Sequence, residues 1–377
     1  MANNETPNTG LGDSGRGDEA LGASGLGGSV ATTSAANSAS PVNREDGRVA
    51  NQNASGTVNH DELKTASGKK RPGDRVFEFL STFSATLITV IIAAIGIFLL
   101  LQAIPPLARN DGGILGFFTY TGQWQTNDLD NMKFGIPNLF FATLMISLIA
   151  LVIAMPIALG IAIFLSNYAP KNLVRPLGSL IDMLAAVPSI VYGLWGAQVL
   201  GPKLTKFYEW IHSWGGDFFL FKTYQNSPAF ASGRNMLTGG IVLAVMILPI
   251  IAATAREIFV QTPPGQIESA LALGATRWEV IRMTVLPFGL SGFIAGSMLG
   301  LGRALGETMA LYMVVSPSID FHPSLFHGGT TFATLIASAA AEFNNPVSAG
   351  AYIAAGLVLF LLTFIVNSIA RAIANKK

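Results

Sequence analysis

Two opposite charges, Arg303 and Glu307, stand inside a long apolar run, in the segment Gly300-Leu-Gly-Arg-Ala-Leu-Gly-Glu-Thr308. A charged side chain at the centre of a membrane helix costs about 2.5–3.5 kcal/mol on insertion scales, so it needs a partner or a water-filled cavity. On a continuous helix the two residues are four apart, share one face and can pair. Two interpretations remain open. The pair is either an ion pair that only sets helix register, or a polar point on a solute path, where Arg303 meets an anion and Glu307 releases it.

A second segment with a distinct pattern lies between two apolar runs, and it reads Glu268-Ser-Ala-Leu-Ala-Leu-Gly274. The sequence predicts a short helix over 266–273, stopped by Gly274, and a second helix over 276–285 that ends at Pro287. A compact helix–turn–helix with a polar face fits the groove of another protein. An amphipathic loop lying at the membrane surface is the alternative.

The elements that must position these residues follow from composition. The chain has 377 residues, of which 50% are hydrophobic and 12% charged, with no cysteine and a mean hydropathy of +0.48. This excludes a soluble enzyme, a disulfide scaffold and a thiolate metal site, and the net charge of +1 gives no reason to expect nucleic-acid binding. The prediction is an all-α, polytopic transmembrane bundle whose six spans cover about 81–104, 139–165, 177–200, 237–259, 287–315 and 351–372.

Residues 1–75 contain few large apolar side chains and are predicted to form a disordered cytoplasmic tail, leaving 76–377 as the transmembrane domain. The basic cluster Lys69-Lys70-Arg71 holds this end in the cytoplasm, and an even number of spans returns the C-terminus there. Loop 316–350, on the outside in this topology, contains no Lys or Arg, whereas the outer loop 201–236 carries four and is the weak case. We therefore expect a multi-pass protein of the cytoplasmic membrane.

The positions of small residues and prolines predict how the helices of the bundle pack and where they bend. Gly292, Gly296 and Gly300 recur at every fourth position, a spacing that lets helix backbones approach closely, so the fifth span is expected at the centre. Pro156, Pro188 and Pro249 lie within apolar runs and predict kinks.

Asp182 opens the third run, either as a helix-start charge at the interface or as a group on the transport path. No span contains His or Cys, which closes a thiol or imidazole route for an intramembrane enzyme, and no metal site or cofactor is expected.

The inner loop is similar to a known pattern. The residues Glu268, Ser269, Ala270, Gly274, Leu286 and Pro287 stand in the order and spacing of the EAA loop of permease subunits in ABC-type importers. That motif reads Glu-Ala-Ala, three residues, Gly, nine residues, Ile, one residue, Leu-Pro, and this chain departs from it at Ser269 and Thr284. The runs 184–196 and 299–309 resemble the phosphate-specific importer, most of all its C-type permease subunit. The resemblance covers about residues 80–377.

This resemblance implies a heterodimer with a second, related permease subunit, two cytoplasmic ATP-binding cassette subunits and an extracytoplasmic phosphate-binding protein. It implies that residues 260–286 form the coupling loop, with 268–274 in the ATPase groove, and that Arg303 and Glu307 are a charged pair associated with phosphate passage. The sequence contains no G-x-x-x-x-G-K-[ST] phosphate loop, so ATP hydrolysis is expected in a separate chain and this chain is expected not to be an enzyme.

Three alternatives remain. The first is a permease for another oxyanion, sulfate or molybdate. The second is an ion-gradient-driven secondary transporter that uses Arg303 and Glu307 as a proton relay, although no convincing internal repeat is present. The third is an intramembrane enzyme, which would need a nucleophile and base or a metal set within the spans, and these contain neither His nor Cys.

Overall fold

The computed structural model describes residues 72–374 except 217, 224–226, 319–320, 341–342 and 344. It divides the chain into two units, Met1–Lys70 and Arg71–Lys377. The predicted tail lies outside the described residues, apart from 72–75, which already belong to the first helix. The transmembrane domain is described below by itself.

Most of the described residues are helical, and the described part of the chain has two isolated β-bridges but no longer strand. The helices are α1 (Pro72–Arg109), α2 (Gly113–Thr119), α3 (Pro137–Ile163), α4 (Lys171–Ala186), α5 (Ser189–Trp195), α6 (Gly201–Gly215), α7 (Pro228–Ala231), α8 (Met236–Val260), α9 (Pro264–Ala272), α10 (Arg277–Val280), α11 (Leu286–Leu305), α12 (Met309–Val314), α13 (Phe332–Ala339) and α14 (Pro346–Ala374). Three π-helical segments join some of them: η2 (Phe164–Tyr168), η3 (Gly196–Leu200) and η4 (Ile281–Val285).

Five helices in the described part of the chain are long and apolar enough to cross a membrane, and a bent pair makes up to six. The single helices are Gly73–Arg109, Pro137–Tyr168, Met236–Val260, Arg277–Leu305 and Pro346–Ala372, and the bent pair joins Lys171–Ala186 to Ser189–Gly215. Five of the six predicted apolar runs fall on one of these elements, and the run 287–315 starts on Arg277–Leu305 and extends past its end into α12. The all-α membrane bundle expected from the sequence is therefore confirmed.

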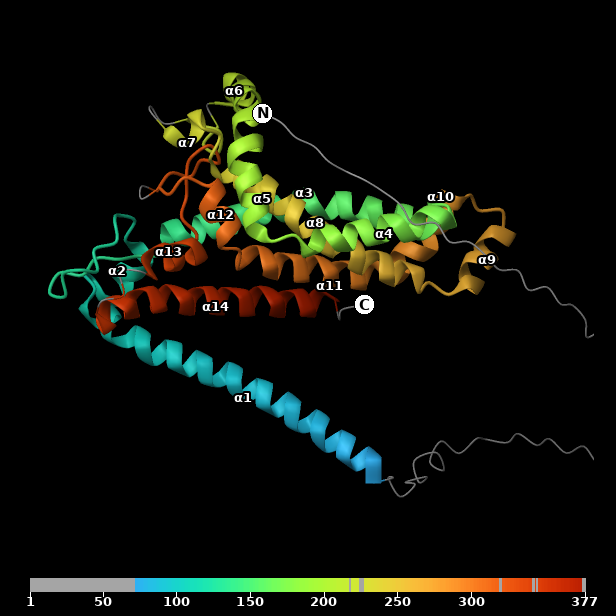
Figure 1. Ribbon diagram of the computed structural model, residues 1–377, viewed down its shortest axis with the longest axis horizontal. Coiled ribbons are helices and arrows are strands. Elements are labelled where there is room, and N and C mark those ends of the chain that lie inside the picture. The colour runs from blue at the N-terminus through green and yellow to red at the C-terminus, as the bar shows by residue number, and fades with distance from the viewer. Residues whose placement is uncertain are drawn as a thin grey trace, which may run out of the picture. The chain divides into compact units, whose positions relative to one another are not determined.

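Contacts between neighbouring helices show in which direction each helix runs relative to the other. Gly289, near the start of α11, lies against Phe259 near the end of α8, and Gly300 lies against Ile251 further back, so α11 runs antiparallel to α8. Gly350 of α14 lies against α1 near the end of α1, so these two helices are also antiparallel, and α14 packs between α1 and α11 (Figure 1).

Small residues build the centre of the domain. A stripe on α3 (Ile146, Ala150, Ala154, Ala158 and Ala162) is fully buried, and α3 packs mainly on α8. Helix α11 also packs on α8, and its Gly289, Gly292, Gly296 and Gly300 lie directly on α8 side chains. The glycine spacing thus predicted the close approach correctly, because a side chain at these positions would separate the two helices.

The third predicted span, 177–200, is not one straight helix. It divides at Val187 and Pro188 into α4 and α5, which meet at 87°. The physical reason is local: the ring of a proline disfavours the helical conformation of the residue before it, and Val187 has the extended angles φ −63° and ψ 131°. Pro156 and Pro249, by contrast, lie inside α3 and α8, which continue through them.

The prediction that the helix after Gly274 ends at Pro287 is wrong. The residues from Arg277 to Leu305 form one continuous helical segment, in which η4 precedes Pro287. Each of the three π-helical segments in fact ends two residues before a proline, at Pro170, Pro202 and Pro287. A proline removes one hydrogen bond and crowds the carbonyl four residues earlier, and a widened turn relieves this crowding. The helix continues through Pro202 and Pro287, whereas before Pro170 it ends at the extended Ala169.

A second buried cluster lies at the end of the bundle away from α9. It joins the end of α1 with α2, the segment 120–136, α13 and α14, around Met132, Phe134 and Phe332. The Trp124 indole donates to the carbonyl of Gly135 at 2.9 Å, which fixes the segment between α2 and α3. The rest of α1 is apolar and largely exposed, as a helix facing lipid or another membrane chain is.

Candidate functional site: the α9 loop and the break between α11 and α12

Helix α9 forms the first candidate site. It covers Pro264–Ala272, against 266–273 predicted, and none of its residues is buried. Two consecutive prolines start it, Ser269 Oγ donates to the Gly265 carbonyl at 2.7 Å, and Gly274 stops it with φ +86°. Just beyond its end, the side chain of Leu273 is 89% exposed. The sequence therefore folds a short helix that projects from the bundle and presents an uncovered leucine.

The segment after Gly274 re-enters the bundle through a capping box. Thr276 Oγ1 accepts from the Glu279 backbone N–H at 3.4 Å, and Glu279 Oε2 accepts from the Thr276 backbone N–H at 2.8 Å. The Thr276 backbone N–H, and after it the Thr276 hydroxyl, which also donates to Oε2 at 2.8 Å, hold the pKa of the exposed Glu279 carboxyl below its ordinary value. Local signals thus start and stop α9 and start the helical segment at Arg277.

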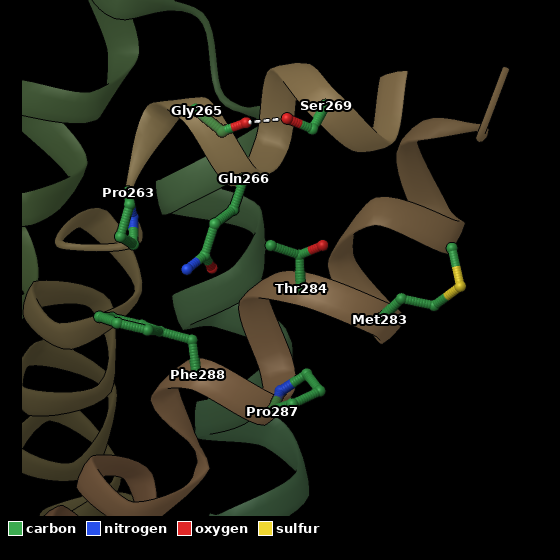
Figure 2. Close-up of a pocket in the computed structure, with 8 residues that line it drawn as sticks. All are labelled: Pro263, Gly265, Gln266, Ser269, Met283, Thr284, Pro287 and Phe288. Atoms are coloured by element: carbon green, nitrogen blue, oxygen red, sulfur yellow. Dashed lines mark hydrogen bonds between the residues drawn. The ribbon is translucent and has the colours of Figure 1, made fainter. Parts of the chain in front are cut away.

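A shallow, open pocket lies between α9 and the start of α11. Ser269 and Pro287, both from the predicted motif, are among its lining residues, together with Gln266 and Thr284. In Figure 2 the side chains of Gln266 and Thr284 point into the space between the two helices. The loop closes on itself here, while Glu268 and Gly274 do not line this pocket and are exposed.

The other two motif residues differ in their placement. Leu286 is half-buried and packs against the main core, whereas Ala270 is half-buried within α9. The motif therefore combines Leu286, which packs the loop against the core, with residues that remain exposed on α9, Glu268 and Ser269.

The second candidate site is a break in the fifth predicted span. Helix α11 ends at Leu305, Gly306 follows with φ −95° and ψ 2°, and α12 starts at Met309. The sequence prediction assumed that Arg303 and Glu307 lie on one continuous helix. They do not, because the break at Gly306 separates them. In the described part of the chain no ion pair within 4.0 Å joins them.

Glu307 is bound to α12 instead. Its side chain is 8% exposed, and its Oε1 accepts the backbone N–H of Ala310 at 3.0 Å. A carboxylate at a helix N-terminus satisfies a backbone donor and interacts favourably with the helix dipole. Glu307 thus serves as the side-chain cap that starts α12 after the break.

Arg303 lies in the last turn of α11 and is exposed in this single chain. The hydroxyl of Tyr192 in α5 donates to the Leu184 carbonyl at 2.8 Å, across the bend between α4 and α5. Gly300 lies against Ile251, and α11 runs antiparallel to α8. Arg303 is therefore level with about the middle of α8. An accessible cation at this depth can meet an anion that passes along the bundle.

Asp182 is not at a helix start. Helix α4 begins at Lys171, so the exposed Asp182 lies well inside it, four residues before its end. The expectation of a helix-start charge is wrong, because Pro170 starts the helix far earlier than the hydropathy of the run indicated.

Arg234, which the sequence interpretation counted only as a loop charge, makes a contact with the end of α12. Arg234, two residues before α8, donates from Nη2 to the carbonyl of Met313 in the last turn of α12 at 2.8 Å. Helix α12 is therefore held by an acid, Glu307, at its start and by a base at its end. Only the position of Arg234 directly before an apolar run could have indicated this.

Comparison with known proteins defines the class. Residues 156–377 match the family model described as "Binding-protein-dependent transport system inner membrane component". The chain belongs to this family, as the EAA-type loop indicated.

Its relatives carry more particular names. The chain is 52% identical over 308 residues to "Phosphate transport system permease protein PstC 2" of Mycobacterium bovis, covering 81% of this chain and 93% of that protein. It is 52% identical over 280 residues to "Phosphate transport system permease protein PstC" of Mycobacterium leprae, covering 74% and 86%. Among solved structures, that of a bacterial alginate ABC transporter in complex with a pentasaccharide-bound periplasmic protein matches with a TM-score of 0.52 and 14% identity, over 81% of this chain and 98% of that one. This likeness concerns the fold alone.

Proposed function

We propose that this chain is a permease subunit of an ATP-driven importer that carries inorganic phosphate across the cytoplasmic membrane. The observation that carries the proposal is the identity of 52% to phosphate permeases over nearly their whole length. The site is consistent with it, because Arg303 is an accessible cation at mid-depth of the bundle and a guanidinium matches a phosphate oxyanion in charge and geometry.

The proposal includes partners. A second permease subunit covers the exposed apolar helices, two ATP-binding cassette subunits bind α9, and an extracytoplasmic binding protein delivers phosphate at the other end. The exposed, projecting α9 and the pocket that braces it support the ATPase contact. In this arrangement both chain ends face the cytoplasm, and the tail before Pro72 is a cytoplasmic segment.

The transport test is uptake of radiolabelled phosphate by the complete assembly in proteoliposomes, with and without ATP inside. ATP-dependent uptake, lowered by excess unlabelled phosphate and not by sulfate or molybdate, is the expected result. Equally strong competition by sulfate or molybdate at the same concentration would mean that the transporter is not specific for phosphate and that another oxyanion is its substrate. Uptake by the isolated chain on an ion gradient alone would instead make it a secondary transporter.

The α9 contact has its own test. The Leu273→Asp variant introduces a charge next to α9, at a position where the leucine is 89% exposed. The control is Leu115→Asp, which introduces the same charge on α2, where the leucine is 78% exposed. We expect the ATPase subunits to co-purify with the second variant and not with the first. Equal co-purification of both variants would refute the contact.

A further inference from the structure

Arg234 lies just before the start of α8, at the end of this helix that is away from α9. Its guanidinium group uses only some of its hydrogen-bond donors. A guanidinium has five N–H donors. One nitrogen, Nη2, donates to the Met313 carbonyl, and Nε is buried with no hydrogen-bond partner in the structure. A buried donor on a charged group without a partner is costly, so Arg234 is not held here by a full set of protein hydrogen bonds.

Two cavities meet at this side chain. The first has a volume of about 440 Å³ and lies between the ends of α12 and α13, with Tyr312, Thr330 and Ser338 in its wall. The second, of about 360 Å³, lies against α5 and η3 and includes the amide side chain of Gln198. Arg234 lines both.

The charge of these cavities has one sign. Among the residues that line them, Arg234 is the charged group and none is a carboxylate. A cleft lined by one sign of charge raises the local concentration of the opposite ion. The hydroxyls are largely bonded to backbone carbonyls, as Ser338 is to Leu335 at 2.9 Å, so the guanidinium supplies the main donors.

From these observations we infer that Arg234 is the cationic group of an oxyanion-binding vestibule at the end of the bundle opposite α9. The vestibule lies about 16 Å from the level of Arg303, since roughly eleven residues of α8 separate the two at 1.5 Å each. An anion entering from this end would meet Arg234 first and Arg303 afterwards. The inference rests on the proposed function for the choice of phosphate as the anion.

The absence of cysteine from the chain allows a direct test in the assembled transporter, with cysteines of the partner chains replaced. Ser338→Cys introduces a thiol into the wall of the first cavity. Ser213→Cys is the matched control, because Ser213 is also an exposed serine bonded to the carbonyl three residues earlier and does not line either cavity. Impermeant anionic and cationic methanethiosulfonates are added from the end opposite α9, with and without millimolar inorganic phosphate.

We expect the thiol at 338 to react faster with the anionic reagent, and phosphate to slow this reaction more than chloride of equal ionic strength does. Arg234→Gln should lower the ratio of anionic to cationic rates by at least about fivefold, while Arg234→Lys keeps it. The control thiol at 213 should show neither effect.

No labelling at 338 from this end, or a rate ratio that Arg234→Gln leaves unchanged, would overturn the vestibule and leave Arg234 as a cap of α12 only. Phosphate uptake by the same Ser338→Cys assembly separates the two proposals. Uptake without charge selectivity refutes the vestibule alone, and selectivity with phosphate protection but without uptake refutes the transport proposal alone.

Discussion

The capping role of Glu307 leads to a quantitative prediction. The carboxylate is 8% exposed and accepts the Ala310 N–H at 3.0 Å. A hydrogen bond to a charged group contributes about 1.5–3 kcal/mol, so Glu307→Ala should lower the free energy of unfolding by that amount. Glu307→Gln keeps an acceptor oxygen and loses the interaction of the charge with the helix dipole, which is worth about 0.3–1 kcal/mol, so it should cost less.

A double-mutant cycle separates this role from an ion pair. Arg303→Gln, Glu307→Gln and the double variant are unfolded by denaturant in mixed micelles, and the three changes in the free energy of unfolding are compared. Because the structure pairs Glu307 with a backbone N–H of α12, the coupling between the two positions should stay below about 0.5 kcal/mol. A coupling above about 1 kcal/mol, or equal stability of the Ala and Gln variants, would refute the reasoning.

Three further substitutions test the packing, the loop and the surface. Gly193→Ala puts a Cβ 2.8 Å from a backbone Cα of α12 and should destabilise by about 1–3 kcal/mol, measured by the same unfolding assay, whereas Gly160→Ala, with nothing within 4 Å, should not destabilise. Gly274→Ala forces a side chain into φ +86° at a strain of about 1–2 kcal/mol, and it should lower ATP-driven phosphate uptake without lowering the amount of folded permease. Asp111→Asn removes an exposed ion pair with Lys133, 3.3 Å long, and should change the free energy of unfolding by less than about 1 kcal/mol, so a larger loss would contradict the assignment of this pair to the surface.

Much of the fold could be predicted from local sequence signals. Runs of about 20 apolar residues must be helical in a bilayer, because every backbone polar group has to be satisfied within the segment, and all six runs fall on helical elements. The short helix α9 is bounded by Pro264 and Gly274, whose backbone preferences act over one or two residues, and its predicted bounds are within two residues of those observed. The glycine spacing of α11 predicted its place against α8 for the same local reason.

The breaks within apolar runs were harder to predict. Hydropathy does not distinguish Pro188, where α4 and α5 meet at 87°, from Pro156, through which α3 continues, because the outcome depends on which neighbouring helices cover the freed carbonyl. The π-helical segment before Pro287 likewise keeps a helix continuous where the sequence predicts an end.

The sequence by itself determined the class of this protein, its helical passes and which charged residues stand within an apolar run, since each depends on composition and on spacing along the chain. Only the tertiary structure decided what those charges contact. Two residues four apart pair only if the helix between them continues, and it stops at Leu305. As a result Glu307 caps α12, and Arg234, 73 positions before Glu307 by number, binds the other end of the same short helix. Such a contact arises from the packing of α8 beside α12, and no sequence spacing encodes it.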